Sequence, residues 1–329
     1  KGCYVVVPET AKNNNGKKKV LASVLAGLAL VGGAVAGNPA HAIVSSDGSI
    51  NTENSRIDIH ANAKPANSVG VNSIVVGYQN TTDDNDGTTA LGANNQAYGN
   101  SGLAVGNQNE SRGGASTAIG AGNRAAGAAT VAIGNVSNAN ARSAIAIGSY
   151  NNVDWTKGTW QTAPKNAGEY STVVGNYSSA TGTSSSAMGI YTNAAGPGSF
   201  AAGYSDNALG QNSVAIGSEN TSHVADTITI GQKNNAKTMG GISIGKNNLT
   251  DSADGNRGDV RRNHENSQIA IGRDNTATEL DTIAIGRETK ATGSGATVIG
   301  ARAEAIGNNA IAIGQSGEGS PKVIAKGVN

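Results

Sequence analysis

The amino-acid sequence predicts an all-β solenoid, a parallel β-roll built from 14-residue coils. A short apolar run closes on a glycine in repeat after repeat, as at Ile119-Gly120 and Ile133-Gly134, and twelve of the fifteen intervals between these glycines are fourteen residues. The composition agrees, since 47 glycines, 3% aromatic residues and one phenylalanine leave few large side chains for an ordinary globular core. A short period kept over most of a chain is typical of stacked repeats. The closing glycines are Gly77, Gly92, Gly106, Gly120, Gly134, Gly148, Gly175, Gly189, Gly203, Gly217, Gly231, Gly245, Gly272, Gly286, Gly300 and Gly314.

The first 42 residues predict an extended signal peptide for export. Three lysines at 17–19 precede an apolar stretch at 20–37, and Ala40-His41-Ala42 has the small-residue pattern of a cleavage site after Ala42. A transmembrane anchor is the alternative, and the small residues with the A-H-A sequence favour cleavage. Cys3, the only cysteine, lies in this leader, so neither a disulfide nor a cysteine metal cluster is expected.

The spacing of the repeats predicts the domain organisation. Residues 43–67 are expected to form a cap or linker, and the β-roll head repeats are expected over residues 68–317. Two intervals of twenty-seven residues mark insertions of about one period, which we place at 152–170 and 248–267. Residues 318–329 follow the last repeat and are expected to begin a connection to a further segment outside this stretch of sequence.

The apolar run before each glycine predicts a strand. The residues one and three before the glycine are mostly Ile, Val or Leu, and residues two apart in a strand share one face. The residue between them is Ala in eleven repeats, and none of the sixty-four residues in the four places before the glycines is charged. A strand face in water usually carries charge. We therefore expect both faces of this strand to be buried.

The two faces receive different predicted roles. The large residue before the glycine is expected to fill its own coil, and the Ala face is expected to pack against copies of the same chain around an axis, because a thin column with an uncharged small-residue face needs a partner. The predicted repeat core includes Ile119, Ile133, Ile147, Ile216, Ile230 and Ile285. The predicted trimer face includes Ala118, Ala132, Ala146, Ala215 and Ala284.

The second half of each repeat predicts a corner and a second strand. Three residues after the glycine, Asn, Ser or Thr recurs, as at Asn95 and Asn123, and stacked amides can hydrogen-bond along a column. Four after, the residue is polar in fifteen of sixteen repeats, which indicates an outward face. Five after, Ala recurs and suits a narrow interior. A second glycine seven after, as at Gly99, permits a tight turn at the other corner.

These motifs resemble those of a known family. SVAIG at 213–217 followed by Asn220, NAIAIG ending at Gly314, and the N-x-A-x-G half-repeats at 95–99 and 123–127 are closely similar to the head repeats of YadA-like trimeric autotransporter adhesins. The resemblance covers about residues 68–317. It implies a left-handed roll, a homotrimeric head, and display at the cell surface and outer membrane of a Gram-negative-type bacterium. No heptad stalk, neck or anchor strands follow Gly314, so we expect an N-terminal fragment whose only membrane attachment is a C-terminal anchor absent from this chain.

The insertions are the candidate binding sites, because loops on a rigid scaffold often carry recognition. The first holds both tryptophans of the chain, Trp155 and Trp160, together with Lys157. Exposed aromatic residues often anchor interfaces; the alternative is that they cap the coil or pack against a neighbouring subunit. The second is polar and contains Arg257-Gly258-Asp259, the tripeptide that integrin ligands present on exposed turns. Multiplying the residue frequencies shows that about one chain in twenty of this composition contains the tripeptide by chance.

Other chemistries find little support in the sequence. The four histidines are scattered, so no triad or metal set is expected, and the chain is predicted to be no enzyme and to need no cofactor. The acidic group Asp83, Asp84 and Asp86 lacks the glycine-rich calcium-roll pattern and reads as a solvated turn. The whole chain has a formal net charge of +1 and the first 42 residues have +4, so the remainder has about −3. This charge does not favour nucleic acid as a partner.

The function predicted is a surface-displayed adhesin head that attaches to host extracellular matrix or cell-surface proteins by multivalent binding. One alternative is self-association, in which the same adhesin on other cells is the partner and no host receptor is needed. A second is a β-helical enzyme on polysaccharide, which would need a groove lined by carboxylates or aromatic residues.

Overall fold

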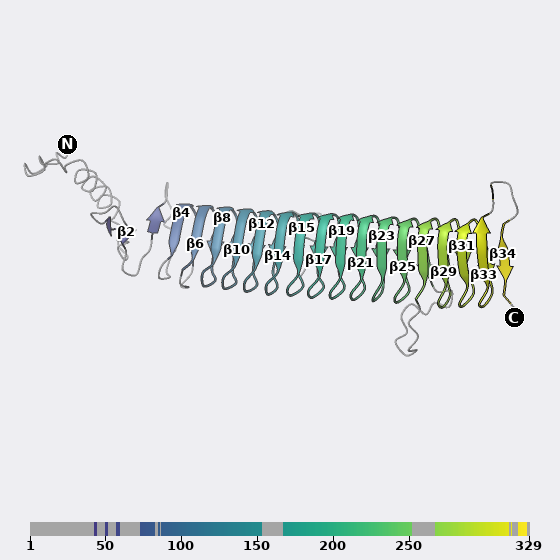
Figure 1. The fold of residues 1–329 in the computed structure, drawn as a ribbon. Coiled ribbons are helices and arrows are strands. Elements are labelled where there is room, and N and C mark those ends of the chain that lie inside the picture. Colours follow the sequence, from purple (N-terminus) through teal and green to yellow (C-terminus); the bar gives the residue numbers. More distant parts are fainter. Residues whose placement is uncertain are drawn as a thin grey trace, which may run out of the picture.

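The computed structural model describes residues 43–44, 50–51, 57–59, 73–82, 85, 87–152, 167–251, 267–315, 317 and 322–327. Over these residues the chain forms strands and turns with no helix, and successive coils stack into a straight rod (Figure 1). No helix in this described part is therefore long and apolar enough to cross a membrane. The fold is the predicted parallel β-solenoid of 14-residue coils.

One long parallel sheet runs along the rod, with one strand from each coil. Its strands pair in order and in register, so that each closing glycine lies beside the next, as Gly120 beside Gly134. The sheet begins at β3, which pairs with β4 and lies inside the segment expected as cap or linker. Its strands are β3 (Ile57–Ile59), β4 (Ile74–Tyr78), β6 (Thr89–Ala93), β8 (Leu103–Asn107), β10 (Thr117–Ala121), β12 (Val131–Asn135), β14 (Ile145–Ser149), β15 (Thr172–Asn176), β17 (Ser186–Ile190), β19 (Phe200–Tyr204), β21 (Val214–Ser218), β23 (Ile228–Gln232), β25 (Ile242–Lys246), β27 (Ile269–Arg273), β29 (Ile283–Arg287), β31 (Thr297–Ala301) and β33 (Ile311–Gln315).

The second half of each coil contributes a short strand to the opposite side of the roll. These strands form a 5-stranded and a 10-stranded parallel sheet, and a separate antiparallel pair, β1 (Ile43–Val44) and β2 (Ile50–Asn51), precedes the roll. The first short sheet contains β5 (Thr81–Thr82), β7 (Gln96–Ala97), β9 (Glu110–Ser111), β11 (Arg124–Ala125) and β13 (Asn138–Ala139). The second contains β16 (Ser179–Ala180), β18 (Asn193–Ala194), β20 (Asn207–Ala208), β22 (Thr221–Ser222), β24 (Asn235–Ala236), β26 (Leu249–Asp251), β28 (Thr276–Thr278), β30 (Lys290–Ala291), β32 (Glu304–Ile306) and β34 (Ile324–Lys326).

Glycine is required at the end of each long strand. Gly134 has a φ of +123°, and a Cβ built on it would lie 1.9 Å from the carbonyl oxygen of Gly148 in the next coil. An L side chain is disfavoured at that φ, and the close approach leaves no room for one. The conserved spacing of the glycines therefore reflects both the turn of the chain and the contact between successive coils.

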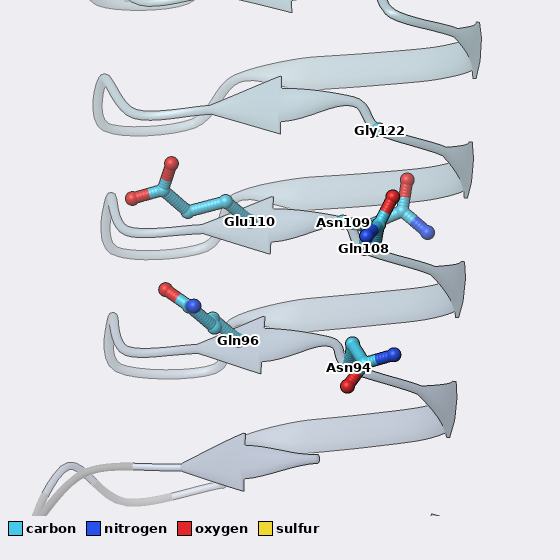
Figure 2. A pocket seen from close by; sticks show the side chains of 6 residues that line it. All are labelled: Asn94, Gln96, Gln108, Asn109, Glu110 and Gly122. Carbon is cyan, nitrogen blue, oxygen red and sulfur yellow. The ribbon is translucent and has the colours of Figure 1, made fainter. Parts of the chain in front are cut away.

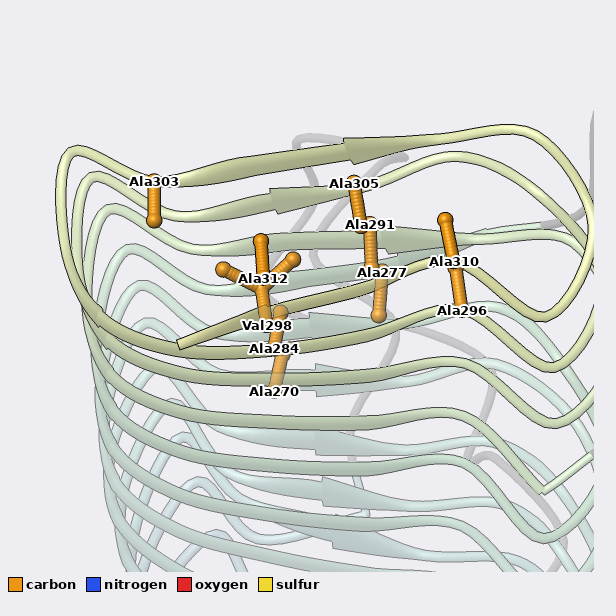
Figure 3. Packing of buried hydrophobic residues seen from close by; sticks show 10 residues of the cluster. All are labelled: Ala270, Ala277, Ala284, Ala291, Ala296, Val298, Ala303, Ala305, Ala310 and Ala312. Carbon is orange, nitrogen blue, oxygen red and sulfur yellow. The ribbon is translucent and has the colours of Figure 1, made fainter. Parts of the chain in front are cut away.

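The core of the roll is made of alanine, and this corrects the prediction about the two strand faces. The predicted trimer-face residues Ala118, Ala132, Ala146, Ala215 and Ala284 are all 0% exposed within a single chain. They point into the coil and meet the buried alanines of the short strands, as Ala270 and Ala284 meet Ala277 and Ala291 near the end of the rod (Figure 3).

The predicted core isoleucines lie on the other face. None of Ile119, Ile133, Ile147, Ile216, Ile230 and Ile285 is buried, and Ile147 and Ile230 are 36% and 37% exposed. The two sheets of a coil lie too close together for large side chains between them, so each strand turns Ala inward and Ile outward. The prediction that the Ile row fills the coil and the Ala row faces outward is wrong, because the Ala row fills the coil and the Ile row lies on the outer face.

The predicted column of amides at the corner is confirmed. In a typical coil, Asn109 donates from Nδ2 to the carbonyl oxygens of Val105 (2.9 Å) and of Gly120 in the next coil (2.7 Å). Its backbone N–H and Nδ2 also donate to Oδ1 of Asn95 in the previous coil, both at 3.0 Å. Asn95 and Asn109 are almost fully buried. The column therefore satisfies carbonyl groups at the turn that would otherwise be buried without a partner.

Candidate binding surfaces

The two insertions leave the roll uninterrupted. Strand β14 pairs directly with β15 across the first, and β25 pairs with β27 across the second. Hydrogen bonds to the previous coil hold the residues on either side of the first insertion. Nδ2 of Asn152 donates to the carbonyl oxygen of Asn138 (2.9 Å), and the N–H of Ala167 donates to Oδ1 of Asn140 (2.7 Å).

The candidate binding residues of the insertions lie outside the described residues. This holds for Trp155, Lys157 and Trp160 in the first insertion and for the tripeptide 257–259 in the second. Their assignment stays a prediction. The same is true of the signal peptide and of the acidic group at 83–86, whose three aspartates also lie outside the described residues.

The outer face of the long sheet is a continuous, mainly apolar surface. Its rows consist of the residues one and three before each glycine, and large apolar side chains follow one another along it. Exposed members include Ile74 (36%), Met188 (45%) and Ile299 (41%). A contiguous apolar surface on a soluble chain usually marks an interface.

Four tyrosines form a stack at the edge of that face. The rings of Tyr150 and Tyr177 are stacked with centroids 5.1 Å apart, those of Tyr177 and Tyr191 are stacked at 5.2 Å, and Tyr204 meets Tyr191 edge-on at 6.1 Å. Such ring contacts stabilise the corner by about 0.5–1.5 kcal/mol per pair. The faces of the stacked rings are occupied by each other, so mainly ring edges and hydroxyl groups remain for a ligand.

A polar groove runs from the same corner onto the short strands in the first coils. It encloses about 490 Å³ between corner residues Asn94 and Gln108 and the outward side chains of Gln96 and Glu110, and Gly122, which has no side chain, leaves one end open (Figure 2). Glu110 is ion-paired with Arg124 (Nε–Oε2 3.1 Å) and Arg112. The groove offers amide groups and one paired carboxylate. It contains none of the paired free carboxylates that general acid–base chemistry on a sugar would use.

Comparison with protein families identifies the repeats. The model for the YadA head domain repeat, described as two copies, matches residues 68–95, 84–109, 180–205, 207–222, 269–289 and 291–316. The repeats form a YadA-like head. No curated protein matches the chain significantly. YadA head domains are structural adhesin modules, not enzymes, so this head region is of an adhesin type.

The YadA-like head carries rows of charged side chains along its edges. Where strand pairing in the described ranges puts two charged residues side by side on the short sheets, they are opposite in sign, as Arg124 beside Glu110 and Lys290 beside Glu304. The long sheet differs, because Lys246, Arg273 and Arg287 lie directly beside one another in three successive strands. Within the described part of the chain, no group of three or more His, Cys, Asp and Glu residues is placed to hold a metal ion.

One acidic residue interrupts the amide column of the head. Asp206 is 0% exposed and occupies the position of the column asparagines. Its Oδ1 accepts hydrogen bonds from the backbone N–H and from Nδ2 of Asn220, both at 2.8 Å, whereas its Oδ2 is buried without a partner. Burial raises the pKa of this carboxyl, and the hydrogen bonds from Asn220 and the nearby backbone of Gly217 oppose that effect.

Sequence reasoning did not find the cationic row, the burial of Asp206 or the tyrosine stack, for different reasons. The cationic row could have been found by reading the residue after each glycine as a column, since Lys246, Arg273 and Arg287 all occupy that position. Asp206 falls in the polar column, but its burial follows from the thickness of the roll. Most of the tyrosine stack could have been found in the same way, since Tyr150, Tyr177 and Tyr191 all lie two residues after a closing glycine in successive repeats and only Tyr204 lies one position earlier.

Proposed function

We propose that three chains of this YadA-like head assemble around a common axis through the outer face of the long sheet. The trimer is displayed at the cell surface of a Gram-negative-type bacterium, where it binds host extracellular matrix or cells. The left hand of the roll and the threefold symmetry come from the family resemblance and belong to this proposal. The observation that supports it is the apolar outer face, which a single chain leaves in water.

Packing that face against copies of itself has a clear driving force. Full burial of an exposed Ile, Val or Met side chain contributes about 1.5–3 kcal/mol, and the side chains of this face, already partly buried in the single chain, gain the fraction that belongs to their remaining exposed surface. The face repeats this gain in coil after coil, which suits a long, continuous interface. Cyclic symmetry closes the apolar surface completely, because the same face of every chain is used.

Adhesion by such an assembly rests on multivalency. Three columns present each weak site three times, and linked sites can raise apparent affinity by a factor of about 10² to 10⁴ without any new contact. The predicted ligand sites fall in the two insertions, and the long sheet keeps its register across both of them. This arrangement suits a protein that binds a partner and does not catalyse a reaction.

The decisive measurement is the mass in solution of residues 43–329, from which the predicted leader is removed. We expect a trimer, and a variant with Ile133→Asp, Ile216→Asp and Ile285→Asp is expected to dissociate. A control with Asn193→Asp, Asn235→Asp and Thr276→Asp adds the same charge to outward positions of the short sheet that are not neighbours in its register, and it is expected to remain trimeric. A stable monomer of the unmodified chain would contradict the proposal.

Self-association between cells is the second candidate. It uses the same trimer, with heads on a neighbouring cell as the partner. Beads coated with the purified head distinguish the two functions. Clumping without any host ligand supports self-association, whereas binding to matrix-coated surfaces without clumping supports host attachment.

A further inference from the structure

We propose that the cationic row formed by Lys246, Arg273 and Arg287 is a binding site for a linear sulfated polysaccharide. This inference rests on the proposed adhesive function and names a chemical class of partner for it. The three residues end strands β25, β27 and β29 and are direct neighbours in the register of the sheet. Neutral residues bound the row, since Gln232 precedes Lys246 and Ala301 follows Arg287.

Stacking three like charges in register is unfavourable for the fold. Like charges placed directly opposite each other on neighbouring strands are destabilising. Elsewhere on this chain the described charged neighbours offset each other: Lys237 and Asp251 are 3.0 Å apart, and Lys233 and Glu219 are 3.5 Å apart. A row that departs from this pattern needs a compensating anion.

Nearby carboxylates compensate only part of the row. Arg273 is 3.4 Å from Asp274 and 3.9 Å from Glu288, and Glu288 is also 3.0 Å from Arg302. Among the described residues of this edge, these two carboxylates and the four cations Lys246, Arg273, Arg287 and Arg302 leave an excess of two positive charges. Within the described residues neither Lys246 nor Arg287 forms an ion pair.

The position of the row suits an extended ligand. Lys246 and Arg273 are exposed and Arg287 is half-buried, and all three are the last residues of their strands, just before the corner. They therefore lie at the margin of the apolar outer face, not in its centre. Neighbouring strands are about 4.8 Å apart, so the row spans about 10 Å along the rod. An anionic chain running along the rod can contact all three side chains.

The chemistry favours sulfate on a sugar chain over nucleic acid. Guanidinium groups form paired hydrogen bonds with tetrahedral oxyanions and are more weakly hydrated than an ammonium group. Single-stranded nucleic acid is usually held by aromatic side chains on which bases stack. The sequence from 242 to 300 contains no Phe, Tyr or Trp. A partner with repeated sulfate groups and no stacking requirement matches what these coils offer.

The test compares two variants of equal net charge in the purified chain. The row variant carries Lys246→Gln, Arg273→Gln and Arg287→Gln. The control carries Arg124→Gln, Lys233→Gln and Lys290→Gln, three cations that each lie near a carboxylate. The probe is a size-defined heparin oligosaccharide, with the desulfated oligosaccharide and a single-stranded DNA of similar charge as companions. Affinity is measured at several salt concentrations, and the mass in solution is measured for each protein.

We expect the row variant to bind heparin at least tenfold more weakly than the parent, with a smaller dependence on salt. The control should bind within about twofold of the parent, and desulfated heparin should not bind. Equal losses in both variants, no binding by the parent, or equally tight binding of DNA would overturn the inference. Loss of the trimer in the row variant would do so too, by assigning the row to contacts between copies. The parent's mass separates the outcomes: a trimer that does not bind heparin refutes this inference alone, and a monomer refutes the proposed function.

Discussion

Replacing Asp206 by asparagine should stabilise the roll at neutral pH. In the neighbouring coil, Nδ2 of Asn220 donates to the carbonyl oxygens of Ile216 (3.0 Å) and Gly231 (2.8 Å). Oδ2 of Asp206 stands near Gly203 where other coils place the amide nitrogen, and it has no hydrogen-bond partner. An ionised carboxylate cannot donate there. Asp206→Asn restores a donor and removes a buried charge.

The size of the effect follows from the burial. An unsatisfied buried polar group costs about 1–3 kcal/mol, and more when it is charged. We expect Asp206→Asn to raise the free energy of unfolding by at least about 1 kcal/mol at pH 7.5. For domains of 150–250 residues this corresponds to about 2–4 °C in melting temperature for each kcal/mol.

The direction of the pKa shift determines how the stability gained by Asp206→Asn changes with pH. Burial raises the pKa of Asp206 in the folded chain above the ordinary value, which applies in the unfolded chain. Below the unfolded value both states are protonated, and the parent carries no penalty from ionisation. As pH rises, the unfolded chain loses its proton first, so stability falls until pH passes the folded pKa. The advantage of Asp206→Asn should therefore be smallest near pH 4 and full at neutral pH.

Thermal unfolding followed by circular dichroism at pH 4 and pH 7.5 checks this expectation. Asp226→Asn is the matched control, because Asp226 is exposed and its Oδ1 accepts from Nδ2 of Asn212 at 3.1 Å. It removes the same charge and should change stability little at either pH. If Asp206→Asn were less stable than the parent at pH 7.5, or gained the same amount at both pH values, the reasoning about Oδ2 would be wrong.

Two further predictions test the packing of the coils by chemical denaturation and circular dichroism. Gly134→Ala should lower the free energy of unfolding by more than about 3 kcal/mol, because its Cβ meets the Gly148 carbonyl oxygen at a φ of +123°. Gly122→Ala, at φ +65° with its nearest neighbour 3.5 Å away, should lower it by about 1–2 kcal/mol. Equal losses would contradict the close approach between the coils. Ala132→Leu should overpack the interior and lower the free energy of unfolding by about 1–3 kcal/mol or more. Ile133→Thr should retain the strand content and weaken assembly instead. The reverse result would support the orientation predicted from the sequence, with Ile inside the coil and Ala outside.

The sequence predicted the period, the strands and the amide column well, because each depends on local spacing. It did not determine which strand face points inward. Alternation shows that the residues one and three before the glycine share a face, but the choice of side depends on how closely two sheets approach. The signal was side-chain size: the position of Ala132 holds only Ala, Val, Thr and Ser, while the position of Ile133 ranges from Ala202 to Met188. An interior of fixed thickness keeps side-chain size constant, and an outer face does not.

This division makes the outer rows free to specialise. Backbone ladders, glycine contacts and alanine packing hold each coil to the next, and they use the same residues along the rod. The residue after each glycine is not part of that framework. It is tyrosine in β19 and becomes lysine and then arginine in β25, β27 and β29, without any change in register. A roll of this kind can therefore change its ligand chemistry from one group of coils to the next at little cost in stability, and the cationic row is where this chain departs furthest from the charge pairing found on its other edges.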